Sequence, residues 1–312
     1  MIVLDAEAVH AALPWPYLVE ELRKTHRGLP PQADVVIQSD PSGSGNQFVT
    51  LPGWLPGGLI AVKMVGVFPG NLSSIPPQPS VQGLVAAFDG QSGAPRLVAD
   101  GAAMTARKTC ADSALGAAIL AREDSENLLI LGAGALAPHM AAAMRAVRPS
   151  IRQIAIWNRT HSRAVALAYD LRAAGLPVEA TEDLDAAVST ADIISCVTMS
   201  DRSLVKGALL KPGAHLDLVG AYLPTMREAD DEAIRRATIF TDTKGNLTNG
   251  GDLLQAVAAG VIDWDDVRAD LYDLAQGRAT GRTSADQITL FKNNGGAHLD
   301  VFTAAALLKA LG

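Results

Sequence analysis

The feature that most constrains this chain is a glycine-rich turn directly after a short apolar run. Residues 128–131 read Leu-Leu-Ile-Leu, and a G-x-G-x-x-A pattern follows at Gly132, Gly134 and Ala137. In such a turn the first glycine allows a tight bend, the second lets backbone approach a pyrophosphate, and the small third residue lets helix and strand pack closely. Pro138 suits a first helical turn, whose exposed N–H groups attract an anion. The pattern predicts a dinucleotide site that includes Gly132, Gly134, Ala135 and Ala137.

Apolar, strand-like runs alternate with helical patterns through this region. Strands are expected at 128–131, 154–157, 193–197, 216–219 and 239–241, with helices such as 138–147 and 163–174 between them. Continuously apolar strands are typical of a parallel sheet that is buried on both faces. We therefore predict an α/β fold with a Rossmann-type doubly wound parallel sheet. In that context the Gly132 turn is favoured as a dinucleotide site over a plain glycine-rich connection.

The end of the second predicted strand bears on the choice of coenzyme. An NAD-selective protein usually carries Asp or Glu there to hold the ribose 2′-hydroxyl, whereas this chain has Asn158, Arg159 and Thr160. Arg159 and Arg163 could bind a 2′-phosphate by charge-assisted hydrogen bonds; the alternative is that both are solvated residues at a helix start. We expect NADP(H) to be preferred, with NAD(H) possible.

The first third of the chain follows a different pattern. Short strands bounded by Gly or Pro are expected at 35–38, 47–51, 59–67 and 83–89, with a hairpin turn at 40–46. A long helix is expected at 105–122, and the helical segment 298–308 could fold back onto the first unit. We therefore expect a second, α+β domain of residues 1–122 and 298–312, built from both chain ends, and a dinucleotide-binding domain of residues 123–297.

Composition narrows the classes of function. Hydrophobic residues make up 48% of the 312 residues and charged residues 19%, and the formal net charge of −7 gives no basic footprint for nucleic acid or an acidic membrane. No apolar run reaches the roughly 20 residues that cross a bilayer, and the start lacks a signal-peptide pattern. Cys110 and Cys196 are far apart, and the 6 His residues lack metal-ligand spacing. We expect a cytoplasmic protein with reduced thiols and no metal site.

Several stretches together resemble the ornithine cyclodeaminase/mu-crystallin family, over nearly the whole chain. They are the segments 58–71, 104–115, 132–137, 157–160, 215–220, 226–228 and 288–292. The resemblance implies a homodimer in which both chain ends form the substrate-binding and dimerisation domain, next to a central Rossmann domain. It also implies one of several activities: cyclodeamination of ornithine to proline, alanine dehydrogenation, or reduction of cyclic imines.

Two lysines are the candidates for binding a substrate carboxylate. Lys63 lies in an apolar stretch, where a lysine either extends to solvent or faces a cleft in which desolvation lowers its pKa. The resemblance places this lysine at the substrate carboxylate. The second cation of the family aligns with Lys108, although Arg107 could serve if the helix were rotated, because neighbours on a helix point about 100° apart. We expect Lys63 and Lys108 to bind substrate and to act in catalysis.

Departures from the family pattern bear on the activity. Cyclodeaminases carry an Arg near Gln32, which offers only a neutral hydrogen bond, and a catalytic Asp at the position of Tyr222. Without that Asp, no carboxylate stabilises the cationic amine chemistry of ornithine. Gln32 and Tyr222 are nevertheless expected among the substrate-binding residues. The resemblance alone adds Thr198 and Val219 to the coenzyme site. The acidic run 228–232 is expected to cap and solvate a helix start.

These residues favour an NADPH-dependent imine reductase acting on a small cyclic imino acid such as pyrroline-2-carboxylate or piperideine-2-carboxylate. Hydride would pass to the C=N carbon, and Lys63 or a bound water would deliver the proton to nitrogen. Two alternatives stay open. One is a lyase that converts ornithine to proline and ammonia with bound NAD, and the other is a non-catalytic NADPH-binding protein of the crystallin type.

Overall fold

The computed structural model describes residues 1–76 and 78–312, which divide into two compact units. Unit 1 contains Met1–Thr109 and Gly295–Gly312, and unit 2 contains Cys110–Asn294. The sequence predicts the first boundary after residue 122, at the end of the long helix. The observed boundary falls inside that helix, α3 (Gly101–Leu120), because its first half packs within unit 1 and its second half within unit 2.

Unit 1 is a mixed sheet with helices packed against it. The strands follow the order β1-β7-β6-β5-β4-β2, and β3 also pairs with β4. The β1–β7 pair is parallel and the others are antiparallel. The elements besides α3 are β1 (Ile2–Leu4), α1 (Ala6–Ala12), α2 (Trp15–Thr25), β2 (Gln32–Ala33), β3 (Val36–Ser39), β4 (Gln47–Trp54), β5 (Leu59–Val67), the 3-10 helix η1 (Pro69–Ser73), β6 (Val81–Asp89), β7 (Pro95–Asp100) and α10 (Ala297–Leu311).

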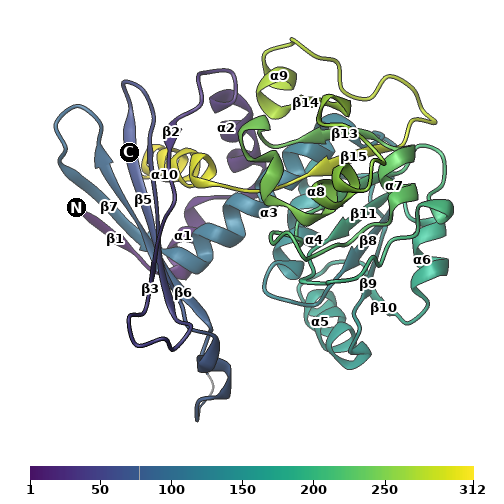
Figure 1. Cartoon of the computed structure of the whole chain (residues 1–312), viewed down its shortest axis with the longest axis horizontal. Coiled ribbons are helices and arrows are strands. Elements are labelled where there is room, and N and C mark those ends of the chain that lie inside the picture. The colour runs from purple at the N-terminus through teal and green to yellow at the C-terminus, as the bar shows by residue number, and fades with distance from the viewer. Residues whose placement is uncertain (77) are drawn as a thin grey trace. The chain divides into compact units, whose positions relative to one another are not determined.

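Both ends of the chain contribute to unit 1. Helix α10, yellow in Figure 1, packs against β5, β4 and α2. The Tyr17 hydroxyl of α2 donates to the Ala306 carbonyl of α10 at 2.9 Å. The predicted hairpin is also confirmed, since β3 and β4 pair antiparallel and the Asp40 N–H donates to the Asn46 carbonyl at 2.9 Å.

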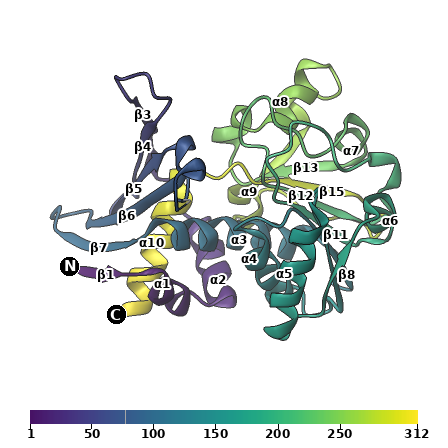
Figure 2. The ribbon, with the colours of Figure 1, turned by 90° about the horizontal axis from the view of Figure 1, so that it is seen from below.

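Unit 2 is a parallel sheet with helices on both faces. The 8 strands follow the order β10-β9-β8-β11-β12-β15-β13-β14, and every pair is parallel. Figure 2 shows α7 and α8 on one face of the sheet and α4 and α5 on the other. The elements are β8 (Asn127–Leu131), α4 (Ala137–Val147), β9 (Gln153–Trp157), α5 (His161–Ala173), β10 (Val178–Thr181), α6 (Leu184–Thr190), β11 (Ile193–Cys196), η2 (Gly207–Leu209), β12 (His215–Leu218), α7 (Asp231–Arg236), β13 (Thr238–Thr241), η3 (Lys244–Asn249), α8 (Gly251–Ala258), η4 (Trp264–Asp266), β14 (Val267–Asp270), α9 (Leu271–Ala275) and β15 (Thr289–Lys292).

The order of these strands locates a ligand crevice. Strand β8 has β9 on one side and β11 on the other, so the chain winds outward in both directions from this point. In sheets of this kind, ligands bind outside the carboxyl ends of the strands where the order reverses. The sheet confirms the predicted fold class, and Leu128 to Leu131 are each at most 1% exposed.

Aspartate caps begin several helices of unit 2. The Asp183 side chain accepts from the Ala186 N–H at 3.0 Å, and that of Asp230 accepts from the Ala233 N–H at 2.8 Å. These bonds satisfy N–H groups that have no partner within the helix. None of the helices in the described part of the chain combines the length and hydropathy that a membrane-spanning helix needs.

Candidate coenzyme and substrate residues

The glycine turn has the geometry that a bound diphosphate requires. Gly132 has a φ of +108°, and a Cβ there would lie 2.9 Å from the Val197 carbonyl oxygen, so this position needs glycine. A Cβ at Gly134 would meet nothing within 4 Å, so its backbone faces open space. Ala137 is fully buried at the start of α4, where its small side chain allows close packing. The residues present therefore fit a dinucleotide diphosphate at the start of α4.

A hollow of about 290 Å³ opens beside this turn, within unit 2. Asn158 joins two of its walls, because its Oδ1 accepts from the Ala133 N–H at 3.2 Å and its Nδ2 donates to the Thr160 carbonyl at 2.9 Å. Of the predicted coenzyme residues, the hollow is lined by Gly132, Gly134, Asn158, Arg159, Thr160, Arg163 and Thr198. Ala135, Ala137 and Val219 are not among its lining residues.

The rim of the hollow carries two exposed arginines. In the described part of the chain, neither the Arg159 nor the Arg163 guanidinium makes an ion pair or a side-chain hydrogen bond, and both side chains line the hollow. Asn158, the residue directly after β9, occupies the place where a carboxylate would hold a 2′-hydroxyl. The lining of this hollow therefore includes two positive charges and no carboxylate.

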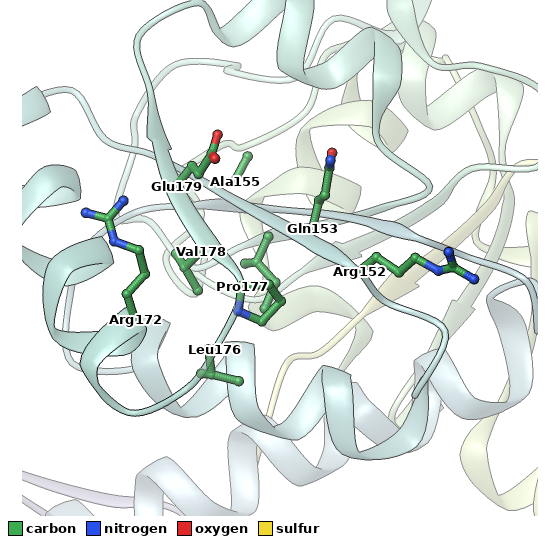
Figure 3. A pocket seen from close by; sticks show the side chains of 9 residues that line it. Arg152, Gln153, Ala155, Arg172, Leu176, Pro177, Val178 and Glu179 are labelled. Atoms are coloured by element: carbon green, nitrogen blue, oxygen red, sulfur yellow. The ribbon is translucent and has the colours of Figure 1, made fainter.

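A second hollow, of about 420 Å³, lies at the opposite end of the same strands. It is lined by the starts of β9 and β10, including Gln153 and Val178. Figure 3 shows Arg152 and Arg172 on opposite sides of it. Because it lies at the amino ends of the strands, it is not where a doubly wound sheet binds a dinucleotide.

Lys63 lies in the middle strands of unit 1, on β5, with its side chain partly exposed. Its Nζ donates to the Thr105 hydroxyl at 2.7 Å, and that hydroxyl donates in turn to the Gly101 carbonyl at 2.7 Å. Burial, and to a smaller extent the charge of Lys108, lowers the pKa of Lys63 to about 8, while Asp300 opposes the shift. An amine with this pKa can give up a proton near neutral pH.

Lys108 is held by a carboxylate that the sequence analysis missed. Its Nζ lies 2.6 Å from Oδ2 of Asp300 and donates to the Gly296 carbonyl at 3.1 Å. Lys108 is 5% exposed and Asp300 is fully buried. The lysine charge is therefore already balanced, and Asp300 fixes where the ammonium points. Asp300 lies in the helix predicted at 298–308. Its pairing with Lys108 could not be predicted from a local pattern, because the two residues are far apart in the chain.

Arg107, the alternative to Lys108, interacts with other side chains of unit 1. Its Nε donates to Nδ1 of His10 at 2.9 Å, and its guanidinium lies 4.0 Å from the centre of a Trp15 ring. A cation in this position stabilises the packing of α1 and α2 against α3. The helix is therefore rotated so that Lys108, and not Arg107, meets Asp300.

Comparisons with known proteins identify the family of this chain. A sequence model of the ornithine cyclodeaminase/mu-crystallin family matches residues 6–310. This chain belongs to that family. It is 39% identical over 302 residues to Delta(1)-pyrroline-2-carboxylate reductase of Paracoccus denitrificans, covering 96% of this chain and 93% of the relative. It is 32% identical over 246 residues to ketimine reductase mu-crystallin of Mus musculus, covering 78% and 74%.

Solved structures of the family have the same fold. Delta(1)-pyrroline-2-carboxylate reductase of Thermococcus litoralis, in complex with NADH and L-proline, superposes with a TM-score of 0.90 at 26% identity, covering 99% of this chain and 97% of that one. Iminosuccinate reductase of Paracoccus denitrificans, in complex with NAD⁺, superposes with a TM-score of 0.87 at 25% identity, covering 99% and 96%. The family and the fold class that the sequence predicted are thereby confirmed.

The two positions that depart from the cyclodeaminase pattern are both exposed. Gln32 is on the short strand β2 of unit 1, paired with Trp54. Tyr222 belongs to unit 2, is 54% exposed, and has its hydroxyl 4.0 Å from the Met199 sulfur. A substrate-binding role for Gln32 and Tyr222 stays a prediction.

One buried carboxylate corrects the expectation for the acidic run 228–232. Asp230 caps α7 as expected, but Glu228 is fully buried instead of solvated. It accepts backbone N–H groups from the segments that follow β11 and β12, including that of Thr198 at 2.7 Å. Burial and the nearby Asp252 charge raise the pKa of Glu228, while Lys292 and the Thr198 bonds oppose the rise. The sequence did not indicate that Glu228 is buried, because runs of acidic residues are usually solvated.

The described residues hold no group of three or more His, Cys, Asp or Glu side chains placed to bind a metal ion.

Proposed function

We propose that this member of the family is an NADPH-dependent imine reductase whose substrate is a small cyclic imino acid, pyrroline-2-carboxylate or piperideine-2-carboxylate. The chain is a nicotinamide-dependent oxidoreductase, as are the reductases that it matches over most of its length. The observation that carries the choice of reaction is Lys63, an amine with a pKa of about 8 beside the Lys108–Asp300 pair. It is a proton donor suited to making an amine from an imine.

In the proposed reaction two lysines of unit 1 have separate roles, proton transfer and binding of the substrate carboxylate. When bound, the nicotinamide supplies a hydride to the imine carbon. The Lys63 ammonium gives a proton to the imine nitrogen as its own N–H bond breaks, which yields the neutral lysine and the amine product. Lys108, held by Asp300, provides a charge-assisted hydrogen bond to the substrate carboxylate. Fixing the carboxylate in this way limits the orientations of the imine, and orientation supplies much of the rate.

The preference for NADP(H) is supported by the rim of the hollow in unit 2. The Arg159 and Arg163 side chains line it, and no described carboxylate pairs with them. An arginine recognises a phosphate through two parallel N–H groups, whereas a 2′-hydroxyl selects a carboxylate. In this chain Asn158 occupies the position of that carboxylate, so a 2′-hydroxyl would find no acidic partner there.

A homodimer formed through unit 1 is also proposed. The exposed side chains of β3 and β4 include Ile37 at 58%, Trp54 at 51% and Phe48 at 44%. Large apolar side chains exposed on the edge strands of a sheet are typical of an interaction surface. Sedimentation equilibrium should give twice the chain mass, and Phe48→Glu should shift the protein toward the monomer; a wild-type monomer refutes the dimer.

The reaction is tested by following coenzyme absorbance with purified protein. NADPH and NADH are each offered with pyrroline-2-carboxylate and piperideine-2-carboxylate, and the amine product is identified by chromatography. We expect NADPH oxidation matched one to one by proline or pipecolate. In parallel, ornithine with NAD⁺ is assayed for ammonia and proline. Ammonia release without net coenzyme oxidation would establish the lyase instead, and tight NADPH binding without turnover would establish a binding protein.

A further inference from the structure

One buried carboxylate joins two loops at the carboxyl edge of the parallel sheet. Oε1 of Glu228 accepts from the Thr198 N–H at 2.7 Å and from the Thr198 hydroxyl at 2.8 Å. Oε2 accepts from the Gly220 N–H at 2.7 Å and from the Ala221 N–H at 3.3 Å. Thr198 follows β11 and Gly220 follows β12, which are neighbours in the sheet. A single side chain therefore binds the ends of two adjacent strands.

The two loops lie so close that the contact depends on glycine. A Cβ at Gly220 would lie 1.7 Å from the Thr198 carbonyl oxygen. The backbones of the two loops are therefore in direct contact on one side, and the Glu228 carboxylate bridges their N–H groups. A change in the position of one loop must move the other.

Glu228 is itself fixed by a second buried carboxylate. Oδ1 of Asp252 accepts from the backbone N–H groups of Glu228 at 2.7 Å and Ala229 at 3.2 Å. Oδ2 of Asp252 lies 3.3 Å from Nζ of Lys292, which also donates to the Ala221 carbonyl at 3.3 Å. Asp252 and Lys292 are both fully buried. This network leaves Glu228 little freedom to turn away from the loops.

The loops that Glu228 holds belong to the second half of the coenzyme site. In a doubly wound sheet each half binds one mononucleotide, and the adenosine ribose lies at the end of the second strand. Here that end is marked by Asn158 and Arg159, after β9. Thr198, in the opposite wall of the same hollow, follows β11 and so belongs to the half that takes the nicotinamide mononucleotide.

We propose that Glu228 is a positioning residue, which does not touch the coenzyme but holds the loops after β11 and β12 in the form that receives the nicotinamide half of the dinucleotide. The proposal rests on the coenzyme binding in the proposed function. Full burial keeps Glu228 from direct contact with a ligand, whereas Thr198 lines the hollow. Its effect on the coenzyme must therefore pass through the backbone of the loops.

The test compares a whole coenzyme with its adenine half. Glu228→Gln keeps the shape of the side chain but replaces one accepting oxygen with an NH₂ group, so one loop loses its acceptor. Isothermal calorimetry then measures Kd for NADPH and for adenosine 2′,5′-bisphosphate. We expect the Kd for NADPH to rise at least about tenfold, since a buried loop N–H group is left without an acceptor, and the Kd for the bisphosphate to stay within about twofold.

The matched control is Asp217→Asn. Asp217 is a fully buried carboxylate on β12, but it accepts from the Ser113 hydroxyl at 2.8 Å and the Ser195 hydroxyl at 2.6 Å and from no loop N–H among the described residues. It should leave both dissociation constants unchanged. Equal weakening of both ligands by Glu228→Gln, or no weakening of either, overturns the positioning role.

A second variant covers the case in which Glu228→Gln does not fold. Glu228→Asp keeps the carboxyl group but shortens the side chain by one methylene, so that it no longer reaches both loops. It should reproduce the selective loss of NADPH binding, and full wild-type affinity in this variant would contradict the proposal. If the wild-type protein bound neither ligand, the dinucleotide site itself would be refuted, which is a different result from a normal variant.

Discussion

Nζ of Lys108 and Oδ2 of Asp300 lie 2.6 Å apart, although the two residues are separated by 192 positions in the chain. Both side chains are buried, so this pair is shielded from solvent and from salt. Removing one partner of such a pair leaves an uncompensated buried charge, which costs about 3–5 kcal/mol. The pair therefore joins α3 to α10 and also orients the candidate substrate cation.

The first prediction concerns Asp300. Asp300→Asn should lower the free energy of unfolding by about 3 kcal/mol, because Lys108 loses its counter-charge. It should also raise KM for the imine while leaving the Kd of NADPH unchanged, since both residues lie in unit 1. Urea unfolding and steady-state kinetics measure the two effects. Asp201→Asn, at an exposed position, is the control, and an equal response from both variants would argue against the pair.

The second prediction concerns Lys63. Lys63→Met should lower kcat/KM for the imine by about 10²–10⁴-fold, the usual contribution of a positioned proton donor, and should leave NADPH affinity unaltered. Lys309→Met removes an exposed lysine of the same unit and should have wild-type activity. If turnover by Lys63→Met matched that of the control, Lys63 would have no place in the reaction.

The third prediction is a pH dependence. The pKa of Lys63 is lowered to about 8 in the folded protein, and the protonated form is the proton donor. The value of kcat/KM should therefore fall as pH rises through about 8. Because the unfolded chain binds this proton more tightly, the same group makes the protein more stable as pH rises above 8. Deprotonation of Lys63 at high pH therefore lowers activity without destabilising the fold. Circular dichroism at each pH checks that the protein stays folded.

The fourth prediction separates the coenzymes. Arg159→Ala should weaken NADPH binding by about 1.5–3 kcal/mol, the range for a hydrogen bond to a charged group, and should barely affect NADH. Arg172→Ala, at the hollow beside the starts of β9 and β10, serves as the control. Calorimetry with both coenzymes gives the comparison, and equal losses for the two would remove the case for 2′-phosphate recognition.

Local patterns in the sequence were enough to place the main elements of both units. The strand at 59–67 was visible because it is an apolar run bounded by Gly and Pro, and the Gly132 turn because only glycine allows its geometry. The lysine within that strand was recognisable for a related reason, since a charge among apolar residues needs a cleft or a route to solvent.

Features that depend on distant partners were not visible in the same way. Strand β15 lies between β12 and β13, although it comes last in unit 2, and its sequence alone does not reveal that insertion. Asp300 and Glu228 looked like ordinary helical and surface acids because burial is set by the packing of other segments. The domain boundary inside α3 escaped notice because the helix pattern continues across it.

The fifth prediction concerns stability and Asp217. Burial raises the pKa of Asp217 to about 6, so its contribution to stability is complete below about 3.8 and is lost as pH rises through about 6. Asp217→Asn stays neutral throughout and should gain roughly 3 kcal/mol relative to the wild type between pH 4 and pH 7. Urea unfolding across this range measures the difference, and a gap that does not vary with pH would contradict the assignment.

The position of α10 in the sequence determines when the Lys108–Asp300 pair can form during translation. Lys108 leaves the ribosome early, but the aspartate that balances it comes from the last helix, after every strand of unit 2 has been synthesised. A chain that has not yet reached α10 therefore contains the Gly132 turn, Arg159 and Arg163, but its Lys108 has no Asp300 to pair with. The Lys108–Asp300 pair can therefore form only after the strands of unit 2 have been synthesised.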